Sequence, residues 1–258
     1  MIGLGRLEQH AHRGSGFPSA GLVCRTALLL LVLTLPAVAQ ENDDCIMCHG
    51  DRRLTGTSGG KVFSVFVDDA RFKASTHGGL ACVGCHADLE GKELPHDAGL
   101  AAVDCSPCHQ AEADLHVKSL HGKALAKGDP LAPRCQSCHG YHDVLPAKDP
   151  ASPVAPLHVP ATCGKCHREG APVAMQRHLA QEHVVENFSE SIHGEGLLRK
   201  GLIVAPHCAS CHTAHSILPH TDAESSIARA NIARTCAACH AQIEMVHRKI
   251  IKGELWEK

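Results

Sequence analysis

The sequence predicts a mostly irregular chain with short α-helices and little β-structure, whose interior is filled by something other than side chains. Its 258 residues include one Trp, one Tyr and five Phe, which is too little bulk for an ordinary core. They also include 15 cysteines and 22 histidines, an abundance that indicates bound cofactors rather than disorder. The formal net charge of −2, without a long basic run, excludes nucleic acid as a partner.

The N-terminus reads as a secretory signal peptide over residues 1–39. Arg25 precedes an apolar run from Ala27 to Leu35, and the small-x-small sequence Ala37-Val38-Ala39 offers a cleavage site. The run is shorter than the roughly 20 residues of a membrane-spanning helix, although an uncleaved anchor is the alternative. We therefore expect an exported chain, periplasmic or extracellular, that is soluble once Cys24 leaves with the signal.

Seven copies of Cys-x-x-Cys-His follow, and they use all fourteen remaining cysteines. This pattern is typical of c-type haem attachment, in which two thioethers tether the haem and the adjacent histidine binds one face of the iron. The sequence thus predicts seven covalently attached haems c. The expected attachment residues are Cys45, Cys48, Cys82, Cys85, Cys105, Cys108, Cys135, Cys138, Cys163, Cys166, Cys208, Cys211, Cys236 and Cys239. The expected first axial ligands are His49, His86, His109, His139, His167, His212 and His240.

Disulfides and zinc are the competing interpretations of these cysteines. Exported cysteine-rich chains often form disulfides, and Cys-x-x-Cys pairs often bind zinc. Neither requires a histidine directly after the second cysteine, and seven such histidines would arise by chance roughly a few times in a hundred million. Seven pairs is also an odd number, whereas zinc sites would combine pairs.

Histidine is the expected second axial ligand of most irons. The mature chain has only Met47, Met175 and Met245, and Met47 lies inside a motif. Setting aside His10, His12 and the motif histidines leaves thirteen of the 22. Because Met/His ligation raises the reduction potential relative to bis-His, we expect low, mostly negative midpoint potentials. In "CHGYH" and "CHTAH" the second histidine is expected to serve a neighbouring haem.

The chain repeats a two-haem module, in which a motif is followed by a histidine-bearing helix, Ser-x-His-Gly and a second motif. We expect modules at 40–98, 99–148 and 159–230, an extended Pro-rich connector at 149–158, and a partial one-haem module at 231–258. In the partial module Lys252 stands where His121 stands, and no eighth motif follows, which favours a fragment of a longer protein.

Regular structure is expected in only a few places. Residues 111–121, 174–193 and 243–253 have helical spacing with few breakers, and 61–68 reads as a small hairpin strand. About thirty residues per haem cannot bury a sizeable side-chain core. The predicted fold is therefore organised around stacked haems, and folding should depend on haem attachment.

These motifs resemble those of exported bacterial multihaem c-type cytochromes with doubled haem motifs, over residues 44 to about 247. The resemblance implies a multihaem cytochrome c fold and second axial ligands at the Ser-x-His-Gly and Cys-His-x-x-His positions. Those positions are His77, His121, His193, His142 and His215. It next indicates His96, His116, His183 and His247, while His158, His178, His207 and His220 are weaker candidates.

The leading functional hypothesis is an electron carrier of respiratory electron transfer, since fully ligated irons leave no place for a substrate. Its partners would be redox proteins that donate and accept electrons, a membrane cytochrome b or quinone-linked subunit among them. The alternative is a multihaem oxidoreductase of the nitrite reductase or hydroxylamine oxidoreductase type, which needs one open iron. The haems at Cys45 and Cys236 are the candidates for that iron, because neither has a complete module around it.

Overall fold

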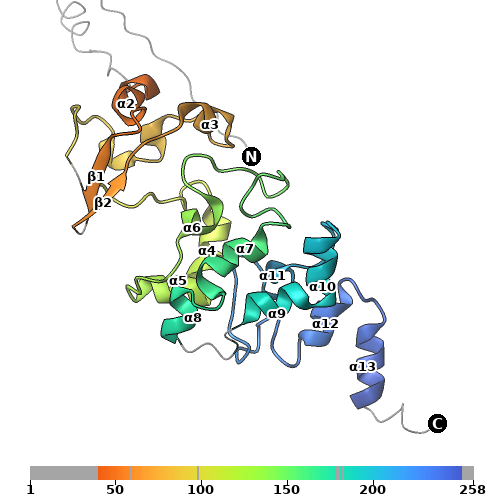
Figure 1. The fold of residues 1–258 in the computed structure, drawn as a ribbon. Helices are drawn as coiled ribbons and strands as arrows, with labels where there is room; N and C mark the ends of the chain where they lie inside the picture. Colours follow the sequence, from red (N-terminus) through yellow and green to blue (C-terminus); the bar gives the residue numbers. More distant parts are fainter. Residues whose placement is uncertain (1–39, 59, 98, 178–180, 182, 252–258) are drawn as a thin grey trace, which may run out of the picture. The chain divides into compact units, whose positions relative to one another are not determined.

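The computed structural model describes residues 40–251 except 59, 98, 178–180 and 182 (Figure 1). The predicted signal peptide and residues 252–258 lie outside this part of the chain. In the part that is described, no helix combines the length and apolarity needed to cross a bilayer.

Short helices joined by irregular segments make up most of the described chain, which confirms the predicted class of little β-structure and mostly irregular backbone (Figure 1). The α-helices are α2 (Asn42–His49), α3 (Asp69–Ala74), α4 (Gln110–Lys118), α5 (Leu120–Ala126), α6 (Cys135–His139), α7 (Val159–His167), α8 (Pro172–Arg177), α9 (Val184–Glu190), α10 (Ile192–Gly194), α11 (Cys208–His212), α12 (Ile232–Ala237) and α13 (Ile243–Ile251). Two 3₁₀ turns, η1 (Cys82–Gly84) and η2 (Ala87–Leu89), and a π-helix, η3 (Glu195–Arg199), complete the helical segments.

One antiparallel hairpin joins β1 (Thr55–Ser58) and β2 (Lys61–Ser64), with Thr55 opposite Ser64. Gly60 lies in its turn at φ +75°, a left-handed conformation that glycine adopts without strain. The strand predicted over 61–68 is thus confirmed as a hairpin strand, but it ends at Ser64. Its partner β1 was not predicted, because the sequence Thr-Gly-Thr-Ser carries no apolar alternation.

Two of the predicted long helices are broken at a serine. The helix expected over 111–121 ends at Lys118, and α5 starts anew after Ser119. Of the helix expected over 174–193, the described parts are α8, α9 and α10, and the last begins after Ser191. At both breaks the serine is extended and its hydroxyl caps the following helix, so the chain turns just before the Ser-x-His-Gly histidine. The helix predicted over 243–253 is confirmed as α13.

The π-helix η3 follows from a difference in length between two copies of the repeat. Cys135 follows His121 by 14 positions, whereas Cys208 follows His193 by 15. A π-helical turn accommodates one extra residue without ending the helix.

The side-chain core is small. Its buried apolar residues in the described chain are mostly alanines and valines, and Leu197 is the only large one with no exposure. They lie on α7, α8, α9, η3 and the turns before α7, α8 and α12. Many large apolar side chains stay exposed, Val204 by 85% and Met47 by 78%, so the polypeptide leaves apolar surface that another group could cover.

Residues 149–158 form consecutive turns rather than the extended connector expected from their prolines. Ser152 in this segment is fully buried and donates a hydrogen bond to the carbonyl of Leu145 at 3.2 Å. Ser225 makes the same bond to Leu218 at 3.1 Å, 73 residues further on. The segment is therefore a packed, repeated part of the fold, and its turns are what lead the chain into α7.

Candidate metal-binding histidine pairs

Six motif histidines face a second histidine that belongs to no motif. The ring centres of each pair are 5.9 to 6.2 Å apart. The pairs are His49–His96, His109–His77, His86–His142, His167–His121, His139–His215 and His240–His193. In every pair the two rings come from different segments of the chain.

The separation fits one metal ion held between two imidazoles. An imidazole nitrogen binds a first-row metal at about 2 Å and lies about 1.1 Å from the ring centre, so two rings on one ion are about 6.2 Å apart. The six observed values lie within 0.3 Å of that figure (6.2 less 5.9). The residues present therefore fit an iron with two histidine ligands.

Direct ring packing explains these pairs less well. Packed aromatic rings span roughly 4.5 to 7 Å, and the separation changes with the tilt between them. Here the angle between ring planes runs from 6° for His49–His96 to 76° for His77–His109, yet the separations of these two pairs are 5.9 and 6.0 Å. A constant distance at any angle is expected when both rings can rotate about a shared nitrogen–metal–nitrogen axis.

The Ser-x-His-Gly sequence positions the second histidine of three pairs. Ser119 is 1% exposed; its hydroxyl accepts from the amide of Gly122 at 3.0 Å and donates to the carbonyl of His116 at 2.6 Å. A Cβ on Gly122 would lie 1.9 Å from the same carbonyl oxygen. The serine thus starts the helix that carries His121, and the glycine lets that helix pack against the end of α4.

A backbone hydrogen bond joins this motif to the segment that carries another paired histidine. The amide of Thr76 donates to the carbonyl of Val144 at 2.9 Å, and the amide of Leu120 donates to that of Ile217 at 2.8 Å. The donors directly precede His77 and His121, while each acceptor lies two residues after His142 or His215. One contact therefore fixes two paired histidines at once.

The first pair has both rings oriented by their other nitrogen. Nδ1 of His49 lies 2.8 Å from the carbonyl oxygen of Val65, directly after the hairpin, and Nδ1 of His96 lies 2.9 Å from that of Asp97. Such a bond fixes the tautomer and leaves Nε2 free for a metal, as is usual for ligand histidines. The hairpin thus has a clear role in placing His49.

Burial favours the neutral form, which is the form that binds metals, for several of the paired imidazoles. It lowers the pKa of His121 to about 4, with smaller contributions from the charges of His167 and His116. It also lowers the pKa of His139 and His142, and there the charge of the facing histidine adds to the effect. For His212 burial is the only contribution.

The thiols of consecutive motifs lie close enough to influence one another's pKa along the whole series. Burial, followed by the charge of Cys45, raises the pKa of Cys82 to about 11. Burial and the neighbouring thiol Cys135 raise that of Cys105 to about 11. A hydrogen bond shared with Cys208, together with burial, raises the pKa of Cys163.

The other consecutive motifs also have thiols that influence each other's pKa. The charge of Cys85 contributes to the raised pKa of Cys105 and that of Cys166 to the raised pKa of Cys138, after burial in both cases. For Cys211 the contribution after burial comes from Cys236. Each motif therefore adjoins the next, from Cys45 to Cys239.

His212 is the one motif histidine that faces no ring among the described residues. This differs from the expectation that an unpaired site would lie at Cys45 or Cys236, because His49 and His240 both have partners. The described structure does not bring His116 or His183 opposite a motif histidine. His116 lies against the carbonyl of Pro133, and Nδ1 of His183 bonds a carboxylate oxygen of Glu169 at 3.0 Å.

Three further predicted candidates take other places. Nδ1 of His158 lies 2.8 Å from the carbonyl of Ser152, a contact that Asn231 makes to Ser225 in the next repeat, so His158 is a structural hydrogen-bonding residue. His207 is half-buried with no described hydrogen-bond partner for Nδ1, and His220 is exposed. His178 and the side chain of His247 lie outside the described residues.

All fourteen motif cysteines are free. Among the described residues, no three His, Cys, Asp or Glu side chains converge as a tetrahedral zinc site requires.

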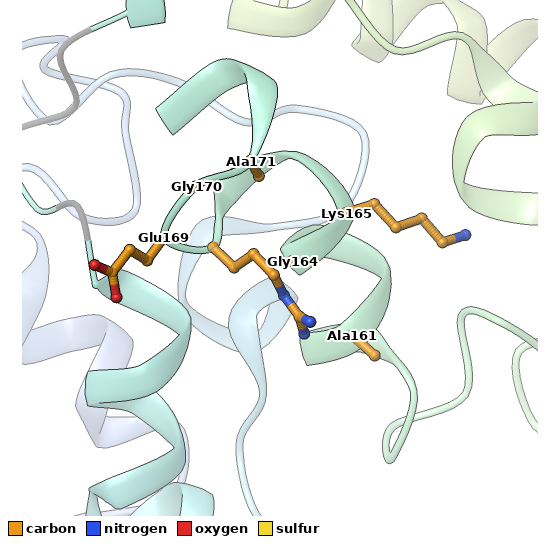
Figure 2. A pocket seen from close by; sticks show the side chains of 7 residues that line it. Ala161, Gly164, Lys165, Glu169, Gly170 and Ala171 are labelled. Carbon is orange, nitrogen blue, oxygen red and sulfur yellow. The ribbon is translucent and has the colours of Figure 1, made fainter. Parts of the chain in front are cut away.

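A shallow pocket lies beside α7 (Figure 2). Its polar side chains are Lys165, Arg168 and Glu169, and the Arg168 guanidinium would lie 3.2 Å from a Cβ on Gly164. No paired histidine lines this pocket.

No protein-family model matches the chain, and no curated protein or solved structure shows significant similarity to it. The sequence pattern predicted every histidine that the structure places in a pair. It did not predict which histidines face each other, nor the supporting carbonyls of Val65, Val144 and Ile217. The repeated Ser-x-His-Gly and Cys-His-x-x-His sequences were the only signal for that arrangement.

Proposed function

We propose that this chain is an exported multihaem c-type cytochrome that carries single electrons along a row of haems in respiratory electron transfer. The observation that carries the proposal is the set of six facing histidine pairs, each with one motif histidine and a separation suited to one iron. Each Cys-x-x-Cys would tether a haem c, and the facing histidines would bind its iron from both sides.

The adjacency of consecutive motifs supports the carrier function. Thiols of neighbouring motifs influence each other's pKa along the whole series. Haems tethered at these thiols would therefore be neighbours in the order of the motifs along the chain. The haem supplies the one-electron chemistry when bound. The polypeptide would hold the haems in this order, exclude water from them and supply imidazole ligands.

The sparse side-chain core also supports this proposal. Contact of exposed apolar residues such as Met47 and Ile192 with water is unfavourable, and seven bound macrocycles would cover much of that apolar area. The chain would then fold as haem is attached.

A spectroelectrochemical titration of the purified protein tests the function. We expect seven one-electron reductions per chain, most of them at negative midpoint potentials. Most potentials well above zero, or fewer than six low-spin haems by EPR, would contradict the carrier hypothesis.

A further inference from the structure

One turn of the chain, which we call the aliphatic turn, exposes three consecutive aliphatic side chains. These are Leu202, Ile203 and Val204, which follow η3 and are 50%, 62% and 85% exposed. Two backbone hydrogen bonds fix the turn. The amide of Leu202 donates to the carbonyl of Gly196 at 3.0 Å, and the amide of Ala205 donates to the carbonyl of Leu202 at 2.8 Å. The three side chains are therefore presented in a defined place.

The preceding repeat forms the same turn from different residues. Counted back from the motif that follows, residues 129–131, with the sequence Asp-Pro-Leu, correspond to the aliphatic turn. Each turn begins after a left-handed glycine, Gly128 at φ +74° and Gly201 at φ +66°. In the earlier turn the amide of Ala132 also donates to the carbonyl of Asp129, at 3.1 Å. The backbone of the turn thus does not require aliphatic side chains.

Contact with a haem does not explain the aliphatic side chains either. The residue that corresponds to Leu202 is Asp129, whose carboxylate accepts a hydrogen bond from the guanidinium of Arg177 at 2.6 Å. A carboxylate packed against an apolar macrocycle would lose its water at a high cost. Because the two repeats share their turn and their motif spacing, this position lies away from the haem in both.

The charges and the size of the turn indicate what covers it. Glu195 offsets the charge of Arg199 through a hydrogen bond of 3.0 Å, so that Lys200 makes the turn locally positive, and residues 196–221 contain no Asp or Glu. Charges beyond about 8 Å are largely screened at physiological ionic strength, so this local charge outweighs the negative net charge. Three aliphatic side chains offer roughly 300 Å² of apolar area. A stable protein interface needs about 800 Å² from each partner, which excludes a second copy held by this turn alone.

We propose that the aliphatic turn inserts into the surface of a phospholipid bilayer and holds the protein there reversibly. Ile203 and Val204 would lie among the first carbons of the acyl chains, with Lys200 at the level of the headgroup phosphates. One small apolar contact gives weak binding, which suits a carrier that must also leave its membrane-bound redox partners. The inference does not require haem attachment, so it and the proposed function can fail separately.

The test is co-sedimentation of the purified full-length protein with vesicles of phosphatidylcholine and phosphatidylglycerol in equal parts, followed by total protein and by haem absorbance. The double variant Leu202→Asp/Ile203→Pro copies the turn that residues 129–131 already form, so it should fold. Its vesicle binding should fall by about tenfold or more. Lys200→Gln should weaken binding by about fivefold. Val62→Asp is the matched control, because Val62 is 69% exposed on β2, and it should bind as the wild type does.

Other results would overturn the inference in distinguishable ways. A wild-type protein that stays in the supernatant has no bilayer contact. Binding that is unchanged in the double variant would place the contact elsewhere on the protein. Self-association that the double variant abolishes would assign the turn to a second copy of the chain. A protein without haem that still binds vesicles through the turn would refute the proposed function and support this inference.

Discussion

Two neighbouring glycines after His77 offer a sharp test of how the Ser-x-His-Gly motif places its histidine. A Cβ on Gly78 would lie 2.3 Å from the carbonyl oxygen of Lys73 and 2.6 Å from that of Phe72, at the end of α3. A Cβ on Gly79 would have no atom within 4 Å. Gly78→Ala and Gly79→Ala therefore add the same methyl group at neighbouring positions. The first methyl group would collide with the backbone of α3, and the second would project into open space.

The size of the effect follows from the contact. Cβ atoms almost never approach closer than 3.0 Å, so the distance to Lys73 must grow from 2.3 to 3.0 Å, a displacement of at least 0.7 Å. Metal–ligand bonds tolerate about 0.2 Å. The ring of His77, adjacent to the displaced residue, should then no longer reach the iron that we propose between it and His109. Overpacking of this kind also costs about 1–3 kcal/mol of folding free energy.

Carbon monoxide binding to the reduced protein measures this loss, because an iron with one histidine binds it and an iron with two does not. We expect Gly78→Ala to bind one more carbon monoxide per chain than the wild type, and Gly79→Ala to match the wild type. Equal binding by both variants would refute the reasoning that the glycine serves to place the histidine.

Four further results are expected. Ser119→Ala removes the cap of α5 and should lower the free energy of unfolding by about 1 kcal/mol in urea titrations. His215→Met should raise one midpoint potential, whereas His220→Met at an exposed position should raise none. Because the amide of Leu131 and the guanidinium of Arg177 donate hydrogen bonds to the Asp129 carboxylate and lower its pKa, the free energy of unfolding should fall as the pH drops below about 4, and it should fall less in Arg177→Gln; an equal fall in both proteins would contradict this. Near-perpendicular ligand rings leave two iron d orbitals nearly equal in energy. The haem proposed between His77 and His109, whose rings meet at 76°, should therefore give a low-spin EPR signal separate from those of the other pairs, whose rings meet at 6–38°.

Sequence reasoning named the paired histidines better than it traced the path of the chain. The Cys-x-x-Cys-His, Ser-x-His-Gly and Cys-His-x-x-His patterns and His96 include every histidine that the structure pairs, while haem attachment stays a prediction. Which rings meet depends on contacts between segments, such as the bond from Leu120 to Ile217, and no local pattern encodes such a contact. His96 faces His49 across 47 positions for the same reason.

The breaks before α5 and α10 have the same physical cause. Helical periodicity ran through Ser119 and Ser191, so continuous helices were predicted across both. A serine whose hydroxyl caps the next turn stops one helix and starts another, and the glycine that follows permits the close approach. Similarly, the prolines of residues 149–158 favoured an extended connector, whereas the buried Ser152 holds the segment in turns.

The central claim is that each Cys-x-x-Cys-His tethers one haem and that six irons lie between the facing histidines. Intact-mass spectrometry of the exported protein tests it most directly. A strongly coloured protein whose mass exceeds that of the mature polypeptide by seven haems is the predicted result. A colourless protein with the mass of the bare polypeptide, its thiols oxidised to cystines or bound to zinc, would contradict the account.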